Sequence, residues 1–318
     1  MAMSKILVTG ASGFLGRALV PALTGAGHAV RLAVRHHIEV GARLEMVTVG
    51  DLAQGVDWSR AVSGVDSVIH LAARVHVMRD RLADPIAAYR TVNRDATLAL
   101  ARAAAQAGAR RFLFVSTIKV LGEATSGRPF TESDAADPQD PYSVSKWEAE
   151  QGLRAIEAGT GMAVVVVRPP LVYGPGVGGN LRRLMRLVDA GIPLPFGAIA
   201  NRRTMVGQRN LADLLVRCVD SDAAAGRTFL AADSESASTA ELIRLIARGL
   251  GRRTRLIPVP VFALRAMGAV SGSSAQVDRL ISSLEVDNAF VRRTLGWVPP
   301  VPLEAGIAEM ARAFQAAA

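Results

Sequence analysis

A tyrosine and a lysine stand four residues apart in the segment 141–146, Pro-Tyr-Ser-Val-Ser-Lys. At the start of a helix this spacing places Tyr142 and Lys146 on one face. A phenol with a pKa of about 10 is a poor base at neutral pH, but a neighbouring ammonium group stabilises the phenolate and lowers that pKa. The pair therefore predicts a tyrosine that exchanges a proton with a substrate hydroxyl. The alternative is that the two side chains are exposed on the helix and have no function. The chain has only three tyrosines and three lysines, so this spacing is not expected by chance.

A threonine that follows the apolar segment 112–115 is the candidate third member of this site. In open parallel α/β sheets, ligands bind at the carboxyl ends of the strands, which is where Ser116 and Thr117 are expected. Thr117 could donate a hydrogen bond to the substrate oxygen, and Ser116 could support the turn. The candidate catalytic residues are Thr117, Tyr142 and Lys146.

Three glycines with the spacing Gly-x-x-Gly-x-x-Gly follow the first strand candidate. Gly10 permits a tight turn, Gly13 lets a pyrophosphate approach the backbone, and Gly16 allows close packing of helix and strand. The start of the helix then offers free N–H groups and a positive dipole end to phosphates. The loop predicts a dinucleotide site, with a turn that binds nothing as the alternative. Its residues in the loop are Gly10, Ser12, Gly13, Phe14, Leu15 and Gly16.

The residue after the second strand candidate bears on the choice of cofactor. An acidic residue there would bind the ribose 2′-hydroxyl, whereas this chain has Arg35, which could pair with a 2′-phosphate or stack on the adenine. Arg35 therefore favours NADP(H), with NAD(H) and a surface arginine as open alternatives. Asp51 and Leu52, after the third strand candidate, are placed to bracket the adenine.

The elements that must position these residues alternate between strand and helix. The strand candidates are apolar on both faces, as in a parallel sheet covered by helices, and lie at 6–8, 30–34, 46–49, 67–71, 112–115 and 164–167. Helical patterns at 96–107 and 144–158 lie between them, which predicts an α/β Rossmann-type doubly wound parallel sheet. We expect a dinucleotide-binding domain at 1–168 and 203–232, and a smaller, discontinuous substrate domain at 169–202 and 233–318.

Composition narrows the class of partner. The net charge is +9, but the basic residues are scattered and aromatics make up 5% of the chain, so we expect no nucleic-acid binding. No apolar stretch reaches the roughly 18–20 residues of a membrane span. The single cysteine, Cys218, suits a reducing compartment and a packed core position. With a strand-like segment from Lys5, we expect no signal peptide and a cytoplasmic location.

Taken together, the motifs resemble the extended short-chain dehydrogenase/reductase family, in its nucleotide-sugar epimerase/dehydratase branch. The resemblance covers nearly the whole chain, and the motifs follow in family order. They are the segments 9–16 and 70–73, Asn93, Ser116 and Thr117, Tyr142 and Lys146, and the segments 168–176 and 295–297.

The resemblance implies further roles, residue by residue. Leu71, Ala72, Ala73, Ser116 and Pro170 would line the cofactor, and Asn93 would support it. A UDP-sugar would be the substrate, with its uridine and diphosphate held by Asn180, Leu181, Arg203 and Arg279. Lys119 could contact a substituent of the sugar or lie in solvent. Relatives pair helices like 96–107 and 144–158 across a two-fold axis, so a homodimer is expected.

Departures from the family pattern restrict the reaction. Dehydratases carry Thr-Asp-Glu where this chain has Thr117-Ile118-Lys119, so dehydration is not expected. The remaining reactions are reduction of a UDP-4-keto-6-deoxy-sugar, which Arg35 and Lys119 favour, and 4-epimerisation of a UDP-hexose. A dehydrogenase of hydrophobic alcohols and a dinucleotide-sensing regulator without activity are more distant alternatives.

Overall fold

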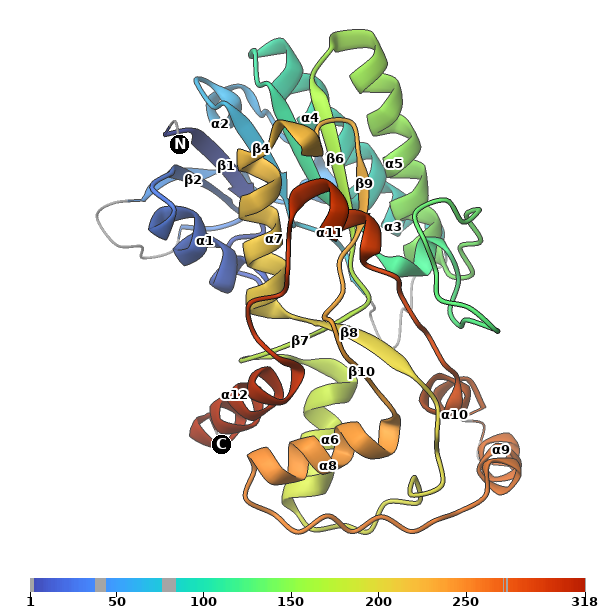
Figure 1. Cartoon of the computed structure of the whole chain (residues 1–318). Coiled ribbons are helices and arrows are strands. Elements are labelled where there is room, and N and C mark those ends of the chain that lie inside the picture. The colour runs from blue at the N-terminus through green and yellow to red at the C-terminus, as the bar shows by residue number, and fades with distance from the viewer. Residues whose placement is uncertain (1–2, 38–43, 76–83, 271, 273, 318) are drawn as a thin grey trace.

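A computed structural model of the chain describes residues 3–37, 44–75, 84–270, 272 and 274–317. Among these residues, seven parallel strands form one large sheet in the order β3-β2-β1-β4-β5-β6-β9 (Figure 1). The strands are β1 (Lys5–Thr9), β2 (Ala29–Val34), β3 (Glu45–Thr48), β4 (Ser67–His70), β5 (Arg111–Val115), β6 (Ala163–Arg168) and β9 (Thr228–Leu230). The strand order reverses between β1 and β4, which is where such sheets bind their ligands. The predicted Rossmann-type fold is confirmed.

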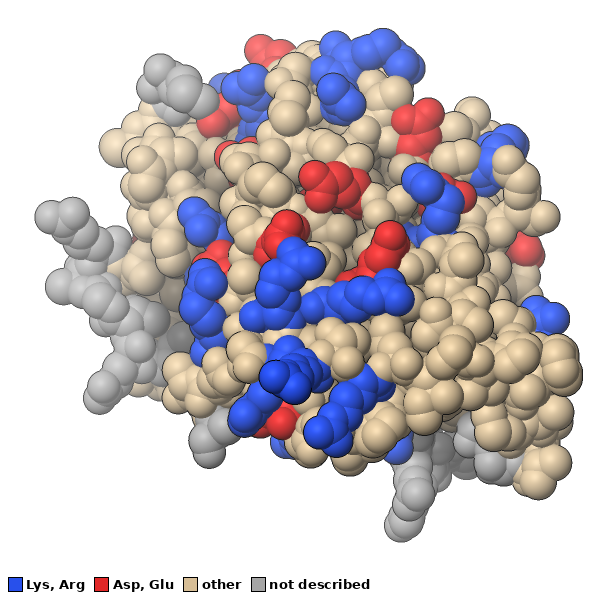
Figure 2. Space-filling view, turned by 60° about the horizontal axis from the view of Figure 1, so that its bottom comes forward, with Lys and Arg blue, Asp and Glu red and all other residues tan. Residues whose placement is uncertain are grey.

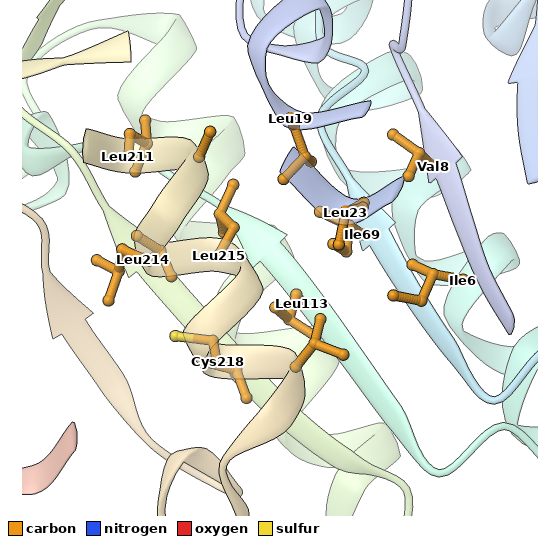
Figure 3. Packing of buried hydrophobic residues seen from close by; sticks show 14 of the residues in the cluster. Ile6, Val8, Leu19, Leu23, Ile69, Leu113, Leu211, Leu214, Leu215 and Cys218 are labelled. Atoms are coloured by element: carbon orange, nitrogen blue, oxygen red, sulfur yellow. The ribbon is translucent and has the colours of Figure 1, made fainter. Parts of the chain in front are cut away.

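Helices cover both faces of this sheet. On one face lie α1 (Gly16–Gly25), α7 (Gln208–Asp220) and α11 (Ala289–Leu295), and on the other α2 (Ser59–Val62), α4 (Ala96–Gln106) and α5 (Pro141–Thr160). Figure 3 shows Leu19 and Leu23 of α1 facing Leu215 of α7 above the strands. Cys218, the only cysteine of the chain, is fully buried in this cluster, as expected.

A second, smaller part of the molecule carries a three-stranded sheet, β10-β8-β7. Its strands are β7 (Leu171–Tyr173), β8 (Arg203–Gly207) and β10 (Ser236–Ala237). Around it lie α6 (Gly179–Asp189), α8 (Thr239–Gly249), α9 (Val261–Val270), α10 (Ser274–Ile281) and α12 (Leu303–Ala316). No helix in the described parts of the chain has the length and apolar character needed to cross a bilayer.

Two boundaries differ from those expected for the domains. β8 lies in the smaller sheet, so the segment 203–232 returns to the large one through α7 and β9. The helix α11 leaves the C-terminal part and packs on the large sheet, because Val291, Leu295 and Trp297 complete the cluster beneath α1 and α7. The chain thus passes between the two parts more often than the expected domain bounds imply.

Candidate active site

The helix α5 begins at Pro141, three residues before the start predicted from its apolar pattern. Asp140 is the reason, because its side chain accepts a hydrogen bond from the Ser143 N–H at 2.7 Å while the Ser143 hydroxyl accepts one from the Asp140 N–H at 3.1 Å. This reciprocal cap satisfies N–H groups that a helix start leaves free. Tyr142 therefore lies in the first turn, one turn ahead of Lys146 on the same face.

Lys146 is buried, with 2% of its surface exposed, and its Nζ lies 3.9 Å from the centroid of the Phe114 ring of β5. Burial lowers the pKa of Lys146 to about 7, although Glu150, one turn further along α5, works in the opposite direction. A lysine in such a place can be charged or neutral near physiological pH. A charged ligand that binds beside Lys146 would therefore change its protonation.

Tyr142 is half-buried against the Tyr89 ring of α3 (Pro85–Arg90), with ring centroids 6.3 Å apart at an edge-on angle. The Tyr89 ring also contacts the Arg74 guanidinium, which lies 5.5 Å from the ring centroid. Burial, and then the negative charge of Asp140, raise the pKa of Tyr142. The expected lowering by Lys146 is not produced by the protein alone, because the groups that shift the pKa of Tyr142 all raise it and Lys146 is not among them. The remaining stabilisation of a phenolate must come from what binds beside the ring.

The end of β5 is fixed by a buried ion pair. The Ser116 hydroxyl donates to Glu150 Oε1 at 2.5 Å, and Glu150 is held by Arg168 at 2.6 Å, all three being nearly inaccessible to solvent. Thr117 follows, buried to 92% of its surface, with its hydroxyl oxygen accepting from the Lys119 N–H. The Ser116 hydroxyl is thus occupied by this ion pair, and Thr117 lies at the carboxyl end of β5.

The glycine loop packs so closely on neighbouring backbone that Gly10 and Gly16 have no room for side chains. A Cβ on Gly10, whose φ is +69°, would come within 2.8 Å of the Ala72 nitrogen, and one on Gly16 would lie 2.3 Å from the Ala11 oxygen. No side chain caps the first turn of α1, and that turn holds no acidic residue. These features fit the pyrophosphate of a dinucleotide. Ser12, Gly13, Phe14 and Leu15 lie in this loop between β1 and α1, as predicted.

A buried histidine connects the glycine loop to the segment after β4. Thr97 donates its hydroxyl proton to the Asn93 carbonyl at 2.7 Å, so it can only accept from His70 Nε2, which lies 2.9 Å away. His70 Nδ1 must then accept from the Thr9 hydroxyl at 2.7 Å, which in turn accepts from the Ala72 N–H at 3.2 Å. Burial, with Lys146 adding to it, lowers the pKa of His70 to about 3, so the ring is neutral. The one consistent pattern of protons holds Ala72 in place beside Gly10.

Asn93 links the same network to α5. It lies in a short π-helix (Thr91–Asp95), a local widening found at functional sites. Its amide accepts from the Arg74 N–H at 2.8 Å and donates to the Arg74 carbonyl at 3.0 Å and to Ser145 Oγ at 3.0 Å. Ser145 donates to the Tyr142 carbonyl at 2.7 Å. Asn93 therefore fixes the segment that includes Leu71, Ala72 and Ala73 relative to the tyrosine.

Residues predicted around the adenine lie at the ends of β2 and β3. Arg35 is exposed directly after β2 and makes no hydrogen bond or ion pair with another described residue. Asp51 uses its carboxylate locally, accepting from the Ala53 N–H at 3.0 Å to cap the short helix Leu52–Gln54. The Arg35 guanidinium is thus available to a ligand, whereas the Asp51 carboxylate already accepts one hydrogen bond.

Three of the residues predicted to hold the substrate gather around Glu123. Lys119 Nζ lies 2.7 Å from Glu123 Oε1 and 2.5 Å from Asp140 Oδ2, and Arg279 Nε lies 3.4 Å from Glu123 Oε2. Arg203 donates to the Arg279 carbonyl at 2.6 Å; burial lowers its pKa, which Glu123 opposes. The structure thus joins Lys119, Arg203 and Arg279 in one charged cluster.

The other predicted substrate and cofactor residues lie apart from this cluster. Asn180 is exposed in the first turn of α6, and Leu181 is buried in the core of the smaller part. Pro170 is buried at the end of β6, next to the Pro169 carbonyl that accepts from the Ile118 N–H at 2.9 Å. No described contact brings Asn180 to the arginines.

Sequence reasoning missed several residues of this region. Glu123, Asp140 and Glu150 were not predicted. The sequence around Glu123 and Glu150 contains nothing that distinguishes them from surface acidic residues. Asp140 alone carried a signal, since Asp followed by Pro is a typical start of a helix. Tyr89 and Gln208, whose amide contacts the Phe14 carbonyl, carried none.

Comparisons with known proteins decide the family. The model of the NAD-dependent epimerase/dehydratase family matches residues 6–232. The chain belongs to this family. It is 44% identical to a UDP-glucose 4-epimerase of Vibrio cholerae over 98% of this chain and 95% of that protein. The resemblance to extended short-chain dehydrogenases/reductases is confirmed, and the chain is an NAD(P)-dependent enzyme.

Solved structures of the family share the whole fold. A UDP-glucuronic acid 4-epimerase of Bacillus cereus in complex with NAD has a TM-score of 0.79 at 21% identity, over 98% of this chain and 96% of that one. RMD of Pseudomonas aeruginosa with NADPH has a TM-score of 0.76 at 21% identity, over 99% and 100%. Similarity at this level shows the fold alone, and family members with this fold bind either dinucleotide.

Proposed function

We propose that the chain is a UDP-hexose 4-epimerase, which inverts C4 of the sugar by oxidising it and reducing it again. The observation that carries this choice is the 44% identity to the Vibrio cholerae UDP-glucose 4-epimerase over nearly the whole chain. The motifs alone favour a single reduction of a 4-keto sugar. The comparison supports the alternative, 4-epimerisation, better than that interpretation.

The proposed chemistry assigns a role to each catalytic residue. The chemistry that a bound nicotinamide dinucleotide supplies is reversible hydride exchange with the carbon that bears the reacting oxygen. Tyr142 takes the proton of the C4 hydroxyl and later returns one to the same oxygen. Thr117 donates a hydrogen bond to that oxygen, and Lys146 supplies positive charge that favours the phenolate.

The substrate would lie between the two sheets. We assign its diphosphate to the cluster around Glu123, where guanidinium and ammonium groups suit phosphate oxygens, and its uridine to the start of α6. This assigns Lys119, Arg203 and Arg279 to the diphosphate and Asn180 and Leu181 to the uridine. We further propose a homodimer formed through α4 and α5.

A reductase remains the second candidate because of one residue. Arg35, exposed and without a described partner, suits a 2′-phosphate, and a reductase must exchange NADPH after each turnover. An epimerase regenerates its cofactor and can retain NAD. We therefore propose retained NAD for the epimerase and NADP(H) for the alternative.

The decisive experiment combines turnover with cofactor content. The purified protein is expected to carry NAD in native mass spectrometry and to interconvert UDP-glucose and UDP-galactose. Tyr142→Phe should lower kcat by at least about a thousandfold, because the ring packs but cannot move a proton, while NAD stays bound. Retained turnover in this variant would refute the assignment of Tyr142. An empty protein that consumes NADPH with a 4-keto sugar would instead establish the reductase.

A further inference from the structure

The helix α9 has an apolar outer face that nothing in the described structure covers. Phe262, Met267 and Val270 expose 76%, 50% and 92% of their surfaces. Phe262, Ala266 and Val270 are spaced four residues apart and point away from the protein, whereas Leu264 and Gly268 are buried on the opposite side. Helices that are apolar all round are normally buried.

The inner side of α9 is firmly packed, so its outer face is held in place. A Cβ on Gly268 would lie 2.8 Å from Cγ2 of Val277 in α10, which shows how closely the two helices approach. Arg265 is the only charged residue of α9 and faces Asp278 of α10 at 3.7 Å. The single charged side chain of α9 is thus paired with α10.

Further apolar side chains are exposed on the segment that leads to α9 and on the segment paired with it. Ile257 exposes 49% of its surface and Ile192, after α6, exposes 46%. Backbone hydrogen bonds from Leu194 to Arg255 at 2.8 Å and from Gly197 to Ile257 at 2.9 Å hold the two segments side by side. We call the exposed side chains of Ile192, Ile257, Phe262, Met267 and Val270 the apolar patch.

Exposed arginines lie beside part of the apolar patch. Arg253 and Arg255 line a hollow of the surface together with Ile192, and neither forms an ion pair with another described residue. Arg252 ties this segment to α6 through Asp189 at 3.0 Å. Figure 2, which looks onto the lower end of Figure 1, shows basic side chains gathered beside a broad uncharged area.

We propose that this face docks on a membrane surface that carries anionic lipids. An exposed apolar helix bordered by arginines is the arrangement of proteins that lie in the headgroup region, with apolar side chains among the acyl chains and cations at the phosphates. The enzyme would thus work at the surface of a bilayer without spanning it.

The test is cosedimentation of the full chain with vesicles of phosphatidylcholine alone and with added phosphatidylglycerol. Binding is expected only when phosphatidylglycerol is present and should weaken with salt. The pair Phe262→Ser and Val270→Ser, and separately the pair Arg253→Gln and Arg255→Gln, should each lower binding by about tenfold or more. The matched controls are Val298→Ser, an exposed apolar residue elsewhere, and Arg102→Gln with Arg293→Gln, exposed arginines on α4 and α11.

A second measurement covers the case in which the serine variants do not fold. Phe262→Trp should show fluorescence that brominated acyl chains quench in phosphatidylglycerol vesicles. Absence of binding by the unchanged protein, or equal binding by all variants, would overturn the proposal. So would a dimer in sedimentation velocity that the serine pair dissociates, because the patch would then be an interface between copies. None of these readouts depends on the proposed reaction.

Discussion

At the scale of single residues, the ionisation of Tyr142 depends on charges that sequence motifs do not include. The Lys119 ammonium and the Ser143 N–H, against the effect of burial, hold the pKa of Asp140 down at about 2. Asp140 is therefore ionised, and its charge raises the pKa of Tyr142. Lys119 offsets that charge at 2.5 Å. The lysine is a positioning residue for the cap and a counterion that favours the phenolate.

Removing this counterion should change the pH dependence of turnover. In Lys119→Met the uncompensated Asp140 disfavours the phenolate, so the acidic limb of the kcat profile should move upward by about half a unit to one unit. Lys119→Arg keeps the charge and should leave the limb in place. Profiles of kcat for both variants check this; a change in KM alone would show that Lys119 acts only on the substrate.

The buried lysine predicts a pH-dependent stability. The pKa of Lys146 is about 7 in the folded protein and near 10.5 when unfolded. Between these values the unfolded chain binds one proton more, so stability rises with pH, whereas below pH 7 the full cost of burying the charge applies. Without cofactor, the unfolding free energy of Lys146→Met should exceed that of the unchanged protein at pH 6 by on the order of 5 kcal/mol.

Urea unfolding of both proteins from pH 6 to pH 10 measures this difference. It should narrow steadily above pH 7 and be nearly gone at pH 10. A difference that stays constant over that range would mean that Lys146 has the same charge in the folded and the unfolded protein, so that its pKa is not shifted.

At the scale of elements, the glycine loop depends on one close contact between α1 and the end of β1. Gly16→Ala would place a Cβ 2.3 Å from the Ala11 oxygen, a backbone atom that cannot turn aside. We expect a loss of about 1–3 kcal/mol in unfolding free energy and weaker dinucleotide binding. Gly25→Ala is the control in the same helix, because nothing lies within 4 Å of its Cβ. Equal stability of both variants would contradict the close approach.

Elements were predictable where their cause is local. The buried strands, the glycine loop and the pair Tyr142 and Lys146 all follow from residues within a few positions of one another. The Ser116–Glu150–Arg168 network and the contact of Glu123 with Arg279 could not be predicted, because they join residues 34 and 156 positions apart. The start of α5 was misplaced because its cap, and not its apolar pattern, sets its beginning.

At the scale of the whole molecule, a buried carboxylate joins the two sheets. Asp233 accepts from the Tyr173 hydroxyl at 2.7 Å, from Asn210 at 2.7 Å and from the Gly207 N–H. These donors lie on β7, on α7 and at the end of β8. Burial raises the pKa of Asp233 and these hydrogen bonds oppose it. One side chain thus holds the smaller sheet to a helix of the larger one.

Removing one donor should weaken both parts together. Tyr173→Phe leaves the buried carboxylate with one partner fewer, and we expect a loss of about 1–3 kcal/mol in unfolding free energy with a single transition retained. Adding Asp233→Asn should cost less in this background than in the unchanged protein, since the two groups interact. Two separate transitions would show that the junction is not what holds the parts together.

The series of hydrogen bonds from Thr9 through His70 and Thr97 to Asn93 has a consequence for protein engineering. Each hydroxyl has one hydrogen to give, so Thr9, His70 and Thr97 fix one another's orientation as far as the Asn93 carbonyl. The Asn93 side chain separately donates to Ser145 on the tyrosine's helix. Grafting the nucleotide loop of another enzyme here would succeed only if the whole series were transplanted with it. A single foreign member would leave a hydrogen with no acceptor and misalign the loop and the tyrosine at once.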